Sequence, residues 1–128
     1  MPQGPLVAIV DDDDSIRDAT ENLLEAAGYS TATFSSAESF MSSERNGRVS
    51  CVVADMRMPG MTGLELAEAL AASGRPIPTV LVTAYPDEQT RLRARQAGIL
   101  CYLSKPFSPE ELCACVDAAL ARSATPRS

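Results

Sequence analysis

The sequence predicts an α/β fold: a parallel five-stranded sheet, doubly wound with helices on both faces. Apolar runs of strand length alternate with helical patterns along the chain, and Gly or Pro marks most of the junctions. The first run, residues 6–10, is continuously apolar, as expected for a strand buried on both faces. Right-handed crossovers and short loops favour the strand order 2-1-3-4-5 for such units.

The first part of the chain predicts two strands and two helices. Residues 6–10 are the first strand, followed by a helix that Asp14 or Ser15 caps and Gly28 stops. One stripe of that helix is apolar and contains Ile16, Ala19, Leu23, Leu24 and Ala27. Residues 29–34 predict a shorter edge strand, residues 36–43 a short helix, and Asn46-Gly47 a turn.

The rest of the chain continues the alternation. A third strand ends at Asp55, and Pro59-Gly60 turns the chain into a helix that the Ser73-Gly74-Arg75-Pro76 segment ends. Residues 77–82 predict a fourth strand. The next helix opens at Pro86-Asp87, has Leu92, Ala94 and Ala97 as its apolar positions, and closes at Gly98. Residues 99–103 predict the fifth strand, and Ser108 with Glu111 forms a capping box at the start of the last helix.

Length and composition indicate one soluble domain. We expect it to span residues 1–122, with residues 123–128 forming a disordered tail or the start of a linker. The net charge of −6 disfavours direct nucleic-acid binding, because phosphate backbones are held by clustered Lys and Arg. No run is long enough to span a membrane and no signal peptide is visible, so we expect a cytoplasmic protein. Its four cysteines are then expected to be free, structural thiols.

Polar residues follow four of the predicted strands. In the order 2-1-3-4-5, the strands that precede Asp11 and Asp12, Asp55, Thr83 and Lys105 are neighbours, so these side chains meet in one crevice. Close carboxylates repel one another unless a cation lies between them, and hard oxygen ligands suit Mg²⁺, or Mn²⁺ in its place. Lys105 and the Thr83 hydroxyl suit an anionic group. Phosphoryl transfer to Asp55 as nucleophile accounts for all five residues.

Four segments resemble the receiver domain of two-component response regulators. They are Val10-Asp11-Asp12, residues 54–63 (ADMRMPGMTG), Val82-Thr83-Ala84 and Lys105-Pro106-Phe107, all in the family's order and spacing. The likeness covers residues 6–121 and is closest to receivers that precede a helix-turn-helix DNA-binding domain. It implies a flavodoxin-like (βα)5 fold.

The resemblance also implies a role for each matching position. Asp55 would accept a phosphoryl group from the phosphohistidine of a sensor histidine kinase. Asp11, Asp12, Asp55 and the backbone carbonyl of Arg57 would bind Mg²⁺, while Thr83 and Lys105 would bind the phosphoryl oxygens. Thr83 and Tyr102 would act as the switch. The domain would catalyse its own phosphorylation and dephosphorylation without being a stand-alone enzyme.

The same resemblance implies an output surface. The face formed by the fourth helix, fifth strand and fifth helix would change shape and contact a partner or a second copy, controlling an output such as transcription. Arg57 and Tyr85 stand where side chains flank the path of the hydrolysing water, and we expect their bulk to slow loss of the phosphoryl group.

Other functions are compatible with parts of the sequence. Asp11-x-Asp13-x-Ser15 after a strand resembles the first motif of haloacid-dehalogenase-type hydrolases, with Asp11 as nucleophile and Asp13 as acid/base. Against this alternative, the chain is short for such an enzyme and has no acidic pair after Lys105. A flavin-binding domain of the same fold is disfavoured, because four consecutive aspartates would repel a phosphate.

Overall fold

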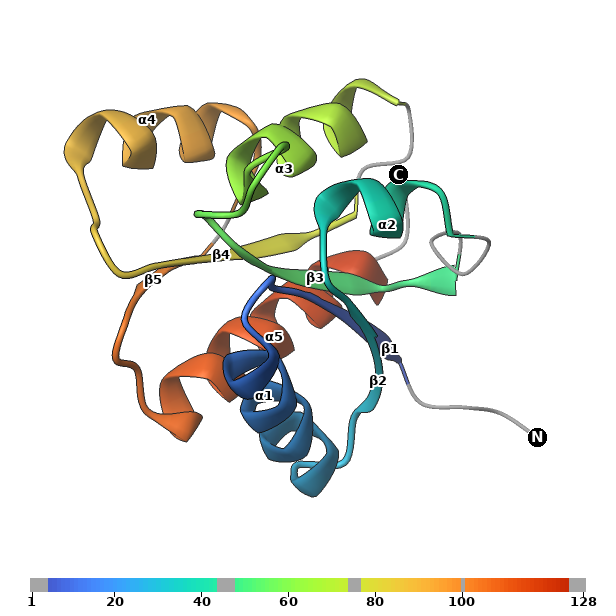
Figure 1. Ribbon diagram of the computed structural model, residues 1–128. Helices are drawn as coiled ribbons and strands as arrows, with labels where there is room; N and C mark the ends of the chain where they lie inside the picture. The colour runs from blue at the N-terminus through green and yellow to red at the C-terminus, as the bar shows by residue number, and fades with distance from the viewer. Residues whose placement is uncertain (1–4, 44–47, 74–76, 100, 125–128) are drawn as a thin grey trace.

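The computed structural model describes residues 5–43, 48–73, 77–99 and 101–124, with side chains of the last helix described to residue 121. Strands and helices alternate along these residues (Figure 1). The strands are β1 (Leu6–Val10), β2 (Ser30–Phe34), β3 (Cys51–Asp55), β4 (Thr79–Thr83) and β5 (Cys101–Ser104). The helices are α1 (Asp14–Ala26), α2 (Ala37–Met41), α3 (Gly63–Ala72), α4 (Glu88–Gln96) and α5 (Pro109–Ala124).

The strands form one parallel sheet in the order β2-β1-β3-β4-β5, which confirms the predicted doubly wound, flavodoxin-like fold. The pairing register aligns the carboxyl ends of four strands: Val10 pairs with Ala54, Asp55 with Val82, and Thr83 with Ser104. The residues that follow β1, β3, β4 and β5 therefore emerge at one edge of the sheet. This is the edge where open α/β sheets bind their ligands.

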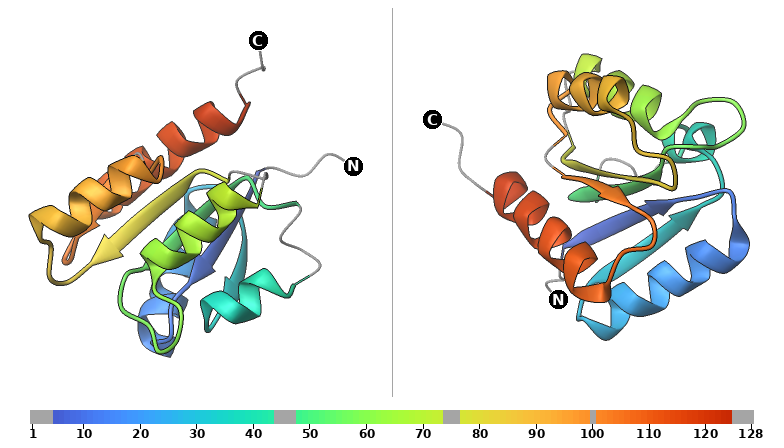
Figure 2. Two further views of the ribbon diagram at one scale, coloured as in Figure 1. Left: turned by 90° about the horizontal axis from the view of Figure 1, so that it is seen from above. Right: turned by 90° about the vertical axis from the view of Figure 1, so that its left-hand side faces the viewer.

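Helices cover both faces of the sheet. Figures 1 and 2 show α1 and α5 on one face and α2, α3 and α4 on the other. Alternate residues of the central strands face the two sides of the sheet. Val7, Ile9 and Val53 pack with Leu24 and Leu112, whereas the residues next to them in each strand enter the second layer. That second layer contains Ala8, Val10, Val52 and Ala54 with Phe40, Leu66 and Leu70. Burial on both faces explains why β3 and β4 are apolar almost throughout.

The cysteines lie mainly against the α1/α5 side of the core. Cys51 in β3 is fully buried, and this burial, with smaller effects from Cys101 and Cys115, raises the pKa of its thiol to about 12. Burial also raises the pKa of Cys115 to about 12. All four cysteines are free, as predicted. A thiol that stays protonated is a poor nucleophile, so Cys51 and Cys115 act as small apolar side chains.

Several local predictions were wrong. Asp13, not Asp14 or Ser15, caps α1, and its carboxylate accepts a hydrogen bond of 3.0 Å from the Ile16 N–H. At α4, the predicted apolar residues Ala94 and Ala97 pack against the core, whereas the predicted Leu92 is 49% exposed. On α1, Thr20 is buried and its hydroxyl donates to the Ile16 carbonyl, whereas the predicted Ala19 is exposed.

Element ends also differ by small steps. β4 begins at Thr79 and β5 at Cys101, later than predicted, and α5 continues to Ala124, past the expected end at Arg122. The predicted Asn46-Gly47 turn, most of the predicted stop at residues 73–76, and residues 125–128 of the predicted tail lie outside the described residues. Among the helices that are described, none has both the length and the apolar character needed to cross a membrane.

Candidate functional site

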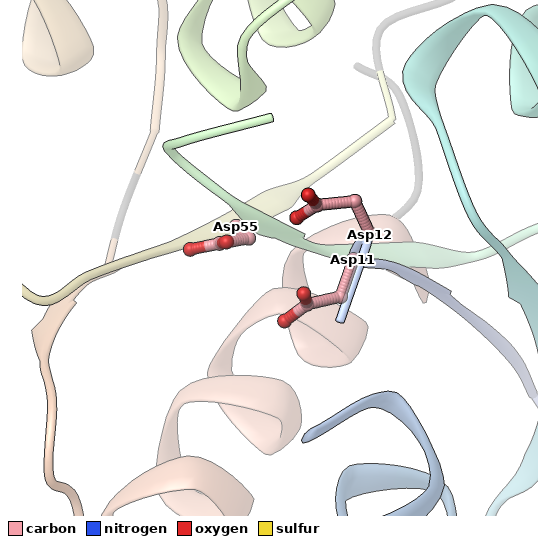
Figure 3. Close-up of side chains that lie close together, drawn as sticks. All are labelled: Asp11, Asp12 and Asp55. Carbon is pink, nitrogen blue, oxygen red and sulfur yellow. The ribbon is translucent and has the colours of Figure 1, made fainter. Parts of the chain in front are cut away.

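The structure brings three carboxylates together at the carboxyl edge of the sheet. Asp11 and Asp12 follow β1 directly, and Asp55 is the last residue of β3. One carboxylate oxygen from each lies within 4.8 Å of the others (Figure 3). Asp11 and Asp55 are buried, with 6% and 9% exposure, whereas Asp12 is exposed. Asp12 is therefore the member of the cluster that is most open to solvent.

Local hydrogen bonds hold the segment that carries Asp11. The Asp13 N–H donates to Asp11 Oδ1 over 2.9 Å, and Arg17 Nη1 on α1 donates to the Asp11 carbonyl over 2.7 Å. Arg17 also forms an ion pair with Asp14. Sequence analysis did not identify Arg17; its position one helical turn after the acids is the signal that was available.

Lys105 places a cation against the cluster. Its Nζ lies 3.3 Å from Asp55 Oδ1, and its backbone N–H donates to the Thr83 carbonyl over 2.8 Å. The β5–α5 loop thus reaches across β4 to the end of β3. At this distance, and with an effective dielectric constant of about 20, two opposite unit charges attract by roughly 5 kcal/mol before desolvation is counted.

One cation does not balance three acids. Burial raises the pKa of Asp55, and Lys105 offsets only part of this effect. Burial also raises the pKa of Asp11; the Asp13 N–H lowers it and the charge of Asp55 raises it further. The cluster keeps an excess of negative charge in a poorly solvated place, and a divalent cation with oxygen ligands would relieve it.

Thr83 and Tyr102 lie next to this cluster on a shared cavity. Thr83 ends β4 and is 1% exposed, and its hydroxyl accepts a hydrogen bond of 3.1 Å from the Tyr85 N–H. Tyr102 on β5 accepts a hydrogen bond of 3.4 Å from the Asp87 N–H. Both line a cavity of about 530 Å³ between the β3–α3 and β4–α4 loops. The predicted switch residues therefore line one cavity, together with Met56 and Arg57, which follow Asp55 in the chain.

The β3–α3 loop forms the wall of that cavity. The backbone N–H of Arg57 lowers the pKa of Asp55, and the Arg57 guanidinium lies 4.7 Å from the centre of the Tyr85 ring. The end of the loop closes tightly on its start, because the Gly63 N–H donates to the Met56 carbonyl over 3.3 Å. A Cβ at Gly63 would lie only 2.5 Å from the Asp55 carbonyl oxygen. The loop can follow this path only with glycine there.

These features define a doubly wound domain. It has an acidic crevice, flanked by a lysine, at the carboxyl edge of its sheet. The chain belongs to the response regulator receiver domain family, because the model of that family matches residues 7–117. It is similar to the transcriptional regulatory protein FixJ of Bradyrhizobium diazoefficiens, with 33% identity over 120 residues. That match covers 94% of this chain and 58% of the relative, so the chain spans little more than half the relative's length.

Solved structures agree with this assignment. The response regulator StyR superimposes with a TM-score of 0.87 and 41% identity, over 94% of this chain and 61% of that one. The FixJ-N crystal structure superimposes with a TM-score of 0.85 and 28% identity, over 99% of both chains. The hydrolase alternative is not favoured by these matches, and Asp13, its required acid/base, is instead occupied in capping α1.

Proposed function

We propose that this receiver domain accepts a phosphoryl group on Asp55 from the phosphohistidine of a sensor histidine kinase. A single observation carries the proposal: the Asp55 carboxylate lies within 4.8 Å of the Asp11 and Asp12 oxygens and 3.3 Å from Lys105 Nζ. Phosphoryl transfer needs a nucleophile flanked by groups that neutralise charge on the transferring oxygens. Asp55 is the carboxylate that has such groups on two sides.

Asp11, Asp12 and Asp55, with the backbone carbonyl of Arg57, are the residues we assign to Mg²⁺. The arrangement fits that ion or Mn²⁺, since the donors are hard oxygens and the cluster carries more negative than positive charge. When bound, the ion would neutralise charge on the phosphoryl oxygens. Asp12, exposed to solvent, leaves the site open on the side from which a phosphohistidine must approach.

In the transfer, an oxygen of Asp55 attacks phosphorus while the P–N bond of the phosphohistidine breaks, and its electron pair returns to the imidazole nitrogen. Lys105 moves from an ion pair with Asp55 to one with the phosphoryl oxygens, and Thr83 donates its hydroxyl to another of them. The same groups allow the domain to catalyse its own phosphorylation by a small phosphodonor and its own dephosphorylation by water.

The switch then depends on Thr83 and Tyr102. Turning the Thr83 hydroxyl toward the phosphoryl group breaks its hydrogen bond with the Tyr85 N–H and changes the wall of the cavity beside Tyr102. Tyr102 would rotate inward, and the α4-β5-α5 face would change shape to contact a partner or a second copy. A phosphoryl group shifts this equilibrium only by interacting better with one arrangement. Control of transcription is the expected output, since FixJ is a transcriptional regulator.

Mass spectrometry after incubation with acetyl phosphate and Mg²⁺ tests the proposal. We expect one phosphoryl adduct, mapped to Asp55, that is absent in Asp55→Asn and in samples containing EDTA. An adduct on Asp11 with rapid turnover of the phosphodonor would instead support hydrolase chemistry. Transfer from a phosphorylated histidine kinase domain to the same residue tests the partner.

A further inference from the structure

Glu38 on α2 makes a contact that neither the motifs nor the acidic cluster explains. Its Oε2 accepts a hydrogen bond of 2.9 Å from the backbone N–H of Met61, in the loop between β3 and α3. The two residues are far apart in sequence, and the bond joins α2 to the loop that follows Asp55. The helices α2 and α3 lie on the same face of the sheet (Figure 2). The Met61 N–H lowers the pKa of Glu38, so the carboxylate stays ionised and the hydrogen bond is charge-assisted.

The turn before Met61 is shaped to allow this contact. Gly60 has a φ of 78°, a left-handed conformation that other residues adopt only with strain. A Cβ at Gly60 would also lie 2.7 Å from Glu38 Oε2. Glycine at this position therefore both turns the Met61 N–H toward α2 and leaves room for the carboxylate.

The loop held by Glu38 carries backbone groups of the site. At its start, the backbone N–H of Arg57 lowers the pKa of Asp55, and the Arg57 carbonyl is the proposed fourth metal ligand. At its end, Thr62 and Glu65 form a capping box that fixes the first turn of α3. Glu38 supplies an anchor between these two ends, from a different element of the fold. Packing also holds this segment, because Met58 is buried in the core and Met61 packs against it, and Glu38 adds a directional hydrogen bond to the backbone.

We infer that Glu38 is a positioning residue, which sets the position of the Arg57 backbone at the acidic site by fixing the β3–α3 loop through Met61. The inference rests on the function proposed above and adds to it a residue outside the acidic, threonine and lysine set. Groups that orient metal ligands through a second layer of hydrogen bonds commonly change metal affinity when removed. Glu38 contacts the loop and not a proposed metal ligand itself, so we expect a smaller effect on metal affinity.

The test compares three variants of the whole chain. Glu38→Ala removes the acceptor, and we expect Mg²⁺ affinity and the rate of Asp55 phosphorylation at subsaturating Mg²⁺ to fall roughly threefold to tenfold. Glu38→Gln removes the same charge but keeps an oxygen that can accept from Met61, and we expect values within about twofold of the wild type. Glu25→Ala is the matched control, an exposed glutamate that accepts from Thr31 at the opposite end of the sheet.

Calorimetric Mg²⁺ titration gives the affinity, acetyl phosphate labelling gives the rate, and hydrogen exchange of the Met61 amide shows whether the bond is lost. Faster exchange with weaker Mg²⁺ binding in Glu38→Ala, rescued in Glu38→Gln, supports the inference. Wild-type affinity and rate in Glu38→Ala would overturn it, as would equal losses in the Ala and Gln variants, which would indicate a charge effect. If the wild-type chain itself is not labelled on Asp55, the proposed function fails instead.

Discussion

Neutralising Asp11 should stabilise the protein when divalent metal is removed. Asp11→Asn keeps an oxygen that can accept the hydrogen bond from the Asp13 N–H but removes a buried charge that lies within 4.8 Å of two other carboxylates. Two like charges 4.8 Å apart repel by about 3 kcal/mol at an effective dielectric constant of about 20. Solvent around the exposed Asp12 weakens the repulsion between Asp12 and Asp11. The substitution also removes the attraction between Asp11 and Lys105, which offsets a further part of the gain in stability. A net gain of about 1–2 kcal/mol remains.

Thermal unfolding followed by circular dichroism measures this gain. In EDTA we expect the midpoint of Asp11→Asn to lie about 3–8 °C above that of the wild type, the shift that such a free energy produces in a chain of 128 residues. Saturating Mg²⁺ should narrow or reverse the difference between the two midpoints, because the ion binds the wild type more tightly than the variant and stabilises it more. Asp18→Asn, an exposed acid on α1, is the control and should change little. A lower midpoint for Asp11→Asn in EDTA would refute the reasoning.

Other properties of the site are testable in the same way. Because burial raises the pKa of Asp11 above its ordinary value of 3.8, the folded state takes up a proton first, and metal-free stability in urea should gain from Asp11 as the pH falls from neutral toward 3.8. This gain in stability should be smaller in Asp11→Asn. An equal gain in the variant would contradict the assignment of the effect to Asp11. Arg57→Ala and Tyr85→Ala should each shorten the phosphoform's lifetime roughly twofold to fivefold, because we expect the bulk of these two side chains, which are in cation–π contact, to hinder the hydrolysing water; unchanged decay of radiolabel would exclude that role. Gly63→Ala should lower the free energy of unfolding by about 2–3 kcal/mol in denaturant melts, since its Cβ would meet the Asp55 carbonyl; a change below about 0.5 kcal/mol would show that the loop can move aside.

The sheet and the crevice could be predicted because their signals are local. Continuous apolar runs identified the buried strands, and the order 2-1-3-4-5 then followed from general rules of connection. Once that order is fixed, Asp11, Asp55 and Lys105 must emerge at the same edge. The 3.3 Å contact between Lys105 and Asp55 is a consequence of topology that the sequence already contains.

What could not be predicted depends on packing between elements. Four consecutive aspartates offered several caps for α1, and only the backbone geometry selects Asp13. Leu92 matched a helical apolar pattern, but α4 is a short, polar helix that meets the core through Ala94. Glu38 was missed because no spacing in the chain relates an exposed glutamate on α2 to the N–H of Met61; that contact exists only after the Gly60 turn forms.

The thiol of Cys51 has a practical use. The sequence contains no tryptophan, so the usual fluorescent reporter of folding is missing. Cys51 lies in the middle strand of the sheet, fully enclosed and protonated at neutral pH. An alkylating reagent can reach it only when the core between the sheet and α5 opens, so its labelling rate reports how often this part of the core opens. With the other three cysteines changed to serine or alanine, the wild-type position would record whether phosphorylation tightens or loosens the whole domain.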